Sequence, residues 1–175
     1  MSEFKPLILI VDDEPMQREM LREHLEKMSN FEIHAFGTGE ECLAAAKIRT
    51  PTIVFLDYQL NNEVKDAMDG IEVLKELKGI YPETDVVMIS GQDKIEVAVN
   101  SIKYGAFDYI VKGEGAFHRA EKSVFNIYRF HKLQSSAKFY KKLMIIFGIG
   151  LLLLILLAIY LQQKGYIRDQ PGMLY

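Results

Sequence analysis

Short apolar runs alternate with longer segments of helical periodicity over residues 5–111. The runs are rich in Ile, Val, Leu and Phe and predict β-strands at 7–11, 31–36, 52–57, 85–89 and 107–111. The segments between them have apolar residues three or four positions apart and predict helices at 15–28, 39–48, 70–77 with its flanks, and 94–104. This alternation, with strands that are apolar throughout, predicts an α/β fold in which a doubly wound, five-stranded parallel sheet is covered by helices.

Another apolar run is much longer than any of the predicted strands. Residues 143–161 (LMIIFGIGLLLLILLAIYL) carry no charge, and only two glycines and one tyrosine interrupt their apolar character. At about 1.5 Å per residue, a helix of this length extends roughly 28 Å, close to the ~30 Å hydrocarbon core of a bilayer. The run therefore predicts a single transmembrane helix. A core helix that is apolar all round is the alternative, and it is disfavoured because the preceding sequence already has the pattern of a complete domain.

Charged residues are distributed unevenly along the chain. Residues 1–114 contain twelve Lys and Arg against twenty-two Asp and Glu, whereas residues 115–142 contain seven against one. The acidic part argues against a nucleic-acid partner, because phosphate backbones bind basic surfaces. The basic part precedes the apolar run, where anionic headgroups of a lipid bilayer would attract it. A fifth helix is predicted to begin at about Phe117 and to continue through this basic part, since neither Pro nor Gly interrupts it as far as Phe147.

The basic residues also predict an orientation in the membrane. The Lys and Arg residues that precede the apolar run within about twenty positions outnumber Lys164 and Arg168, which follow it. By the positive-inside rule, the N-terminal side of the run then lies in the cytoplasm. The apolar run at 7–11 is too short for a secretory signal. We therefore expect a single-pass membrane protein with a cytoplasmic N-terminal domain.

Polar side chains stand at the C-terminal ends of four predicted strands. Asp12 and Asp13 follow the first strand, Asp57 ends the third, Ser90 follows the fourth, and Lys112 follows the fifth. Right-handed crossovers bring these ends to one edge of a parallel sheet, where ligands bind. Three clustered carboxylates would repel one another unless a cation joins them, and their hard oxygen ligands suit Mg²⁺. Beside such an ion, a lysine and a hydroxyl can bind the oxygens of a phosphoryl group.

Each of these residues also has an ordinary interpretation when it is taken alone. An aspartate often caps a helix, a lysine is often solvated, and a serine is common in loops. The cysteine and the histidines offer no competing metal site by their spacing. Cys42, the only cysteine, is predicted to be a small core residue. The four histidines are predicted to be surface or packing residues, at 24, 34, 118 and 131.

Taken together, the strand-end residues resemble the receiver domain of response regulators, and the resemblance covers residues 5 to about 133. It implies the flavodoxin-like fold and a protein that accepts a phosphoryl group from a histidine kinase or phosphotransfer protein. By this resemblance, Asp57 is the phosphoacceptor. Asp12 and Asp13 bind Mg²⁺ together with Asp57 and the backbone carbonyl of Gln59.

The resemblance also assigns the residues that respond to phosphorylation. Lys112 pairs with the phosphoryl group, and Ser90 is the switch hydroxyl. Gly91 is the small residue that leaves the phosphate accessible. Tyr109 matches the aromatic residue that rotates inward once the hydroxyl is drawn toward the phosphate, although an exposed strand aromatic is its ordinary interpretation.

Two features depart from the family pattern. Gly113 follows Lys112 where the family usually has proline after a cis peptide bond, and glycine does not favour the cis form as proline does. The loop at 58–69 (YQLNNEVKDAMD) is longer than the resemblance leads one to expect. Because this loop borders the site, its length could affect dephosphorylation or the choice of partner.

These observations predict four parts. They are a receiver domain at 1–133, a basic juxtamembrane segment at 134–142, a transmembrane helix at 143–161 and a short C-terminal tail at 162–175. The first hypothesis is a signalling protein, not an enzyme, whose phosphorylation changes a surface that binds a second copy or a membrane protein. The alternative is a membrane-tethered scaffold that does not depend on phosphorylation. A transcription factor is disfavoured because no DNA-binding module follows the receiver domain.

Overall fold

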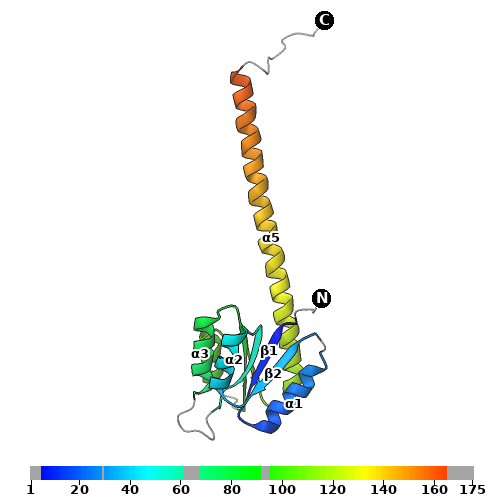
Figure 1. The fold of residues 1–175 in the computed structure, drawn as a ribbon, viewed down its shortest axis with the longest axis vertical. Coiled ribbons are helices and arrows are strands. Elements are labelled where there is room, and N and C mark those ends of the chain that lie inside the picture. The colour runs from blue at the N-terminus through cyan, green and yellow to red at the C-terminus, as the bar shows by residue number, and fades with distance from the viewer. Residues whose placement is uncertain (1–4, 29, 61–67, 92–94, 165–175) are drawn as a thin grey trace. The chain divides into compact units, whose positions relative to one another are not determined.

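A computed structural model describes residues 5–28, 30–60, 68–91 and 95–164, in which strands and helices alternate along the chain (Figure 1). The strands are β1 (Leu7–Val11), β2 (Glu32–Phe36), β3 (Ile53–Asp57), β4 (Asp85–Ser90) and β5 (Asp108–Val111). The helices are α1 (Pro15–Glu26), α2 (Gly39–Ile48), α3 (Gly70–Ile80), α4 (Ile95–Lys103) and α5 (Ala116–Gln163). Most of the long loop at 58–69 and most of the predicted tail at 162–175 lie outside the described residues.

The five strands form one parallel sheet in the order β2-β1-β3-β4-β5. From β1 the chain first adds β2 on one side, and it then adds β3, β4 and β5 on the other side. This reversal creates a switch point between the C-terminal ends of β1 and β3, which is where open α/β sheets bind ligands. The register pairs Val11 with Leu56 and Asp57 with Ile89, so the strand ends lie along one edge. The predicted five-stranded parallel sheet is confirmed.

A hydrophobic core forms on each face of the sheet, because successive strand residues point to opposite faces. Leu9 and Val11 of β1 pack in the core that includes residues of α2 and α3. Ile8 and Ile10 pack in the core that includes residues of α1 and the first part of α5. The central strands β1 and β3 are buried over their whole length. Both cores therefore hold the C-terminal ends of β1 and β3 in fixed positions.

Local sequence signals set the starts of the helices that follow these strands. Pro15 occupies the first turn of α1, where its missing N–H costs no hydrogen bond. The Thr38 hydroxyl accepts a hydrogen bond from the backbone N–H of Glu41 at the start of α2. At the start of α3, Asp69 accepts from the N–H of Glu72, and the Glu72 carboxylate accepts from the N–H of Asp69. This reciprocal capping box begins α3 close after the loop that borders Asp57.

Contacts within the chain divide it into two units, 1–127 and 128–175. Within the second unit, the helical stretch Lys142–Gln162 is long and apolar enough to cross a membrane. Its large apolar side chains are exposed, as Leu154 at 64% and Phe147 at 71% illustrate. The stretch therefore does not have the burial of a core helix. The domain boundary at 133 that the sequence indicates stays a prediction.

Candidate functional site

Three aspartates meet at the C-terminal edge of the sheet, on the two sides of the switch point. Asp12 and Asp13 follow β1, and Asp57 is the last residue of β3. Carboxylate oxygens of all three lie within 4.8 Å of one another. Asp12 is 6% exposed and Asp57 4%, whereas Asp13 is half-buried. The fold thus brings together the three carboxylates that the sequence predicts to be neighbours.

Lys112 joins the two buried carboxylates from the end of β5. Its Nζ lies 2.8 Å from Asp12 Oδ2 and donates a hydrogen bond to Asp57 Oδ2 at 2.7 Å. The backbone N–H of Lys112 donates to the carbonyl of Ser90 at 2.7 Å, which anchors the lysine to the neighbouring strand end. One ammonium group therefore partly balances the charge of two buried acids.

Backbone amides hold the other oxygens of these two carboxylates. The N–H of Glu14 donates to Asp12 Oδ1 at 2.9 Å, and the N–H of Gln59 donates to Asp57 Oδ1 at 3.2 Å. In each carboxylate, one oxygen thus bonds the backbone two residues later and the other bonds Lys112. Both side chains are held in defined orientations as a result.

The electrostatics of the site follow from burial. Desolvation raises the pKa of Asp57 above its ordinary value, although Lys112 and the N–H of Gln59 act in the opposite direction. Burial alone would lower the pKa of Lys112, but hydrogen bonds to Asp12 and Asp57 outweigh it, so its pKa is raised. Lys112 therefore remains an ammonium group at neutral pH.

The ligand chemistry of the cluster fits Mg²⁺. One lysine beside three carboxylates leaves an excess of negative charge that a divalent cation would balance. The nearby donor groups are oxygens, which hard cations such as Mg²⁺ prefer. Gln59, whose carbonyl the family resemblance adds to the ligands, is fixed beside Asp57 by its N–H.

The two predicted switch residues lie on β4 and β5. Ser90 ends β4 and is fully buried, and Asp57 and Ile89 are paired where β3 and β4 end. Tyr109 lies in β5, half-buried, and packs against the core on the α2 and α3 face. Gly91 leaves open space, because an added Cβ there would meet nothing within 4 Å. These positions are compatible with the switch roles, which stay predictions.

Gly113 uses the conformational freedom that glycine provides. Its φ of 144° lies in a region that other residues rarely adopt, and Gly115 has a φ of 74°. No cis peptide bond occurs among the described residues, so Lys112 is joined to Gly113 by a trans bond. The side chain of Lys112 is instead positioned by its contacts with Asp12 and Asp57.

Gly70 contacts the backbone of the site more closely than the sequence predicts. A Cβ at this position would lie 2.1 Å from the carbonyl oxygen of Asp57 and 2.8 Å from the Cα of Tyr58. The N–H of Gly70 also donates to the carbonyl of Tyr58 at 3.0 Å. In the sequence, the only sign of this close contact is that a glycine directly follows Asp69, the residue that caps α3. The absent side chain of Gly70 lets α3 begin against the end of β3.

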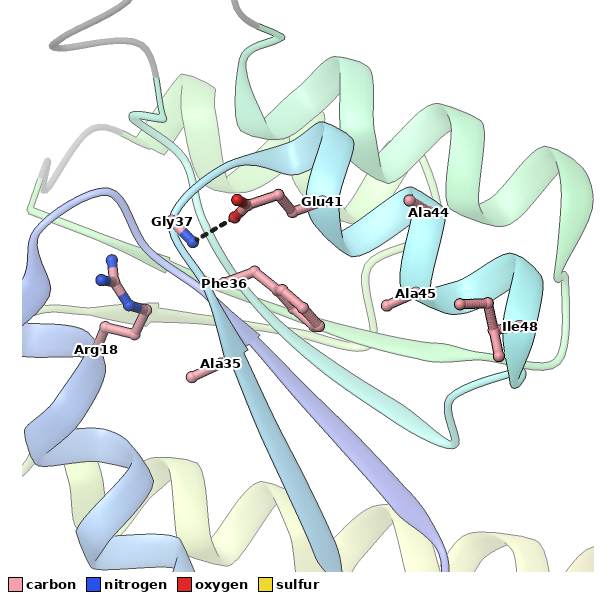
Figure 2. Close-up of a pocket in the computed structure, with 8 residues that line it drawn as sticks. All are labelled: Arg18, Ala35, Phe36, Gly37, Glu41, Ala44, Ala45 and Ile48. Atoms are coloured by element: carbon pink, nitrogen blue, oxygen red, sulfur yellow. Dashed lines mark hydrogen bonds between the residues drawn. The ribbon is translucent and has the colours of Figure 1, made fainter.

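A hollow that is separate from the three aspartates lies beside the edge strand β2. Its volume is about 540 Å³. Figure 2 shows Phe36 and Ile48 among the residues that line it. The N–H of Gly37 donates to the Glu41 carboxylate at 3.1 Å within it. None of the three clustered aspartates lines this hollow. We therefore do not include it in the candidate site.

Relatives of this chain are regulatory proteins. The receiver domain of response regulators matches residues 8–119. The nitrogen assimilation regulatory protein NtrX of Azorhizobium caulinodans is 40% identical over 105 residues, which are 60% of this chain and 22% of that protein. The regulatory protein AtoC of Escherichia coli is 34% identical over 105 residues, with the same coverage of 60% and 22%. The chain thus spans about a fifth of the length of these two relatives.

Solved structures show the same fold. The crystal structure of the receiver domain of NtrX from Brucella abortus has a TM-score of 0.59 and 36% identity, and the match covers 70% of this chain and 95% of that chain. A receiver domain protein from Methanospirillum hungatei has a TM-score of 0.64 and 26% identity, and the match covers 74% of this chain and 98% of that chain. The receiver match extends over more than half of the residues. The chain therefore belongs to the response regulator receiver domain family.

Proposed function

We propose that this chain is a membrane-anchored receiver that accepts a phosphoryl group on Asp57 from a histidine kinase or phosphotransfer protein. The observation that carries the proposal is the contact of Lys112 Nζ with the carboxylates of both Asp12 and Asp57 at the switch point of the sheet. A buried carboxylate beside an ammonium group and further acids is arranged to receive a phosphoryl group. Family membership of residues 8–119 supports the same reaction class.

The proposed transfer needs a nucleophile and a balance of charge. A carboxylate oxygen of Asp57 attacks the phosphorus of a phosphohistidine, the new O–P bond forms as the P–N bond breaks, and the imidazole leaves with the electron pair. Asp12, Asp13, Asp57 and the carbonyl of Gln59 would hold Mg²⁺, and the bound ion would supply positive charge to balance the phosphoryl oxygens. Lys112 supplies a second positive charge beside the acceptor oxygen.

The response to phosphorylation is proposed to begin at Ser90. A phosphoryl group on Asp57 adds hydrogen-bond acceptors next to β4, and the Ser90 hydroxyl then donates to one of them. Tyr109 on the adjacent strand β5 occupies the space that this movement vacates. The phosphorylated and unphosphorylated forms thereby present different surfaces to a second copy or to a membrane-protein partner.

The anchoring is supported by the composition and exposure of residues 143–161. Monomeric soluble proteins seldom expose an apolar patch larger than a few hundred Å². The run has exposed apolar side chains over five helical turns, and basic residues precede it. A bilayer is the environment in which this surface would be stable, with the receiver domain in the cytoplasm.

Mass spectrometry tests the phosphoacceptor directly. The full chain in detergent micelles, incubated with Mg²⁺ and acetyl phosphate, should gain the mass of one phosphoryl group. Asp57→Asn should not gain it. Asp85→Asn is the matched control, because Asp85 begins β4 at the opposite end of the strands and should leave the adduct unchanged.

Two results would contradict this assignment. An adduct that persists in Asp57→Asn would place the phosphoryl group on another residue. Absence of an adduct on the unmodified chain would favour the alternative of a membrane-tethered scaffold with a receiver fold.

A further inference from the structure

A second cluster of metal-ligating side chains lies away from the strand ends, where α1 packs against the first turns of α5. It consists of His24 on α1 and of His118 and Glu121 on α5. His24 Nε2 lies 3.2 Å from Glu121 Oε2, and His118 Nδ1 lies 3.6 Å from the same oxygen. One ligand atom of each residue lies within 4.8 Å of the others.

The packing of α1 on α5 places the three residues next to one another. His118 and Glu121 are three residues apart on one helix, so they occupy the same face. His24 lies in the last turn of α1 and faces them, with its ring 6.0 Å from that of Phe117 and 6.3 Å from that of His118. Leu21 and Leu25 of α1 and Ala120 of α5 are buried in the shared core, which fixes the two helices against each other. The cluster is thus held by a packed core and not by mobile loops.

We propose that His24, His118 and Glu121 bind a divalent transition-metal ion of the zinc class, with water as a further ligand. Two imidazoles and one carboxylate form a recognised ligand set for Zn²⁺, which then keeps an open coordination position. With metal–ligand bonds of about 2.0–2.2 Å, the ligand atoms of a tetrahedral site lie roughly 3.3 Å apart. The distances of 3.2 Å and 3.6 Å to Glu121 are close to this value.

The ligand type separates this site from the acidic cluster. Imidazole nitrogen favours zinc and its neighbours in the first transition row, whereas oxygen-only sites suit Mg²⁺. The ion would link α1 to α5 without taking part in chemistry at Asp57.

Substitutions on the protein surface keep the test independent of folding. The side chain of His118 is 85% exposed, so His118→Gln removes one ligand and little packing. His34→Gln is a matched control: its Nε2 pairs with a glutamate oxygen, Glu32 Oε1, at 2.9 Å, but it belongs to no group of three ligands among the described residues. Each glutamine keeps a polar side chain at its position.

The experiment measures Zn²⁺ binding to the full chain, purified in detergent without a polyhistidine tag and kept in excess Mg²⁺ so that the acidic cluster is occupied. Co²⁺ absorption reports the coordination geometry, and competition by Zn²⁺ gives the affinity. One equivalent should bind with a tetrahedral Co²⁺ spectrum. His118→Gln and His24→Gln should each weaken Zn²⁺ binding by at least about tenfold, the scale of effect that even supporting groups around metal sites produce, and His34→Gln should leave it unchanged.

Three results would overturn the proposal. They are absence of Zn²⁺ binding to the unmodified chain, equal affinity for the unmodified chain and His118→Gln, and an equal loss of affinity in His34→Gln and His118→Gln. The phosphoryl-transfer proposal stands or fails separately, because its measurement at Asp57 does not involve Zn²⁺.

Discussion

Lys112 holds two acids together that would otherwise repel each other. The exposed fractions of the side chains are 19% for Lys112, 9% for Asp12 and 5% for Asp57, so water screens their interaction only weakly. Removing one partner from such an arrangement leaves buried charges without compensation. The lysine thus has a structural role in the absence of metal, in addition to its proposed role in phosphoryl transfer.

Lys112→Ala should lower the free energy of unfolding of the metal-free protein. We expect a loss of about 2–3 kcal/mol, less than the roughly 3–5 kcal/mol for a fully buried ion pair, because Lys112 is partly exposed. Mg²⁺ should raise the melting temperature of this variant more than that of the unmodified chain, since it then replaces the positive charge that Lys112 supplies to Asp12 and Asp57. Thermal unfolding of the full chain in micelles, followed by circular dichroism with and without Mg²⁺, measures both effects.

The matched control is Lys47→Ala, because Lys47 is exposed on α2. It should change the free energy of unfolding by less than about 0.5 kcal/mol. Equal stability of the two variants, or equal shifts with Mg²⁺, would show that Lys112 does not compensate the buried acids.

Sequence reasoning identified the residues of the acidic cluster because each ends or follows a strand, and parallel strands end at one edge. It could not show that Lys112 contacts both Asp12 and Asp57, since side-chain conformation is not contained in the strand pattern. It also gave no sign that His24 and Glu121 meet. These two residues are 97 positions apart and come together only through the packing of α1 on α5.

At the scale of elements, the beginning of α3 depends on a close approach to β3. Gly70→Ala would place a methyl group against backbone atoms of Asp57 and Tyr58, which cannot move aside as a flexible side chain does. We expect a loss of about 1–3 kcal/mol in the free energy of unfolding, the range for overpacking. Phosphorylation by acetyl phosphate should also become slower, because the proposed acceptor Asp57 must shift.

Gly79→Ala, in the same helix, is the control for the glycine substitution itself. Gly79 is exposed, and an added Cβ there would meet nothing within 4 Å. Alanine should stabilise the helix by roughly 0.5–1 kcal/mol through its higher helix propensity. Chemical denaturation and the initial rate of phosphorylation should therefore separate the two variants. If Gly70→Ala behaved like Gly79→Ala, the close contact would not constrain the site.

The hydrophobic pattern located every strand and helix of the receiver domain but not all of their ends. The apolar periodicity of α1 extends to Met28, whereas the helix ends at Glu26. Met28 still packs against the core, and its N–H donates to the carbonyl of Leu25. Phe31 likewise belongs to the apolar run of β2, although pairing begins where Leu7 of β1 meets Glu32. Apolar residues that flank an element contribute to burial without sharing its hydrogen bonds.

At the scale of the whole molecule, charge and hydropathy divide the chain into an acidic, a basic and an apolar segment, in that order. The acidic excess lies in residues 1–114, and the basic excess in residues 115–142 directly precedes the uncharged run at 143–161. The family match ends at residue 119 and the buried core of the first unit includes α5 as far as Ile127, so the receiver fold does not account for the uncharged run at 143–161. The order of the three segments is the one expected for a cytoplasmic domain next to an anionic membrane surface.

Membrane insertion gives the final prediction. The full chain should stay in the membrane fraction after washing with alkaline carbonate, because this treatment removes peripheral proteins and does not weaken burial of an apolar helix. Leu152→Arg combined with Leu156→Arg keeps the length of the run but adds about 2.5–3.5 kcal/mol of insertion cost per arginine, so this variant should be released. A protease added outside intact cells should leave the receiver domain uncut, since the basic residues before the run favour the proposed orientation with this domain in the cytoplasm. Release of the unmodified chain by carbonate would exclude the transmembrane helix, and cleavage of the receiver from outside would reverse its orientation.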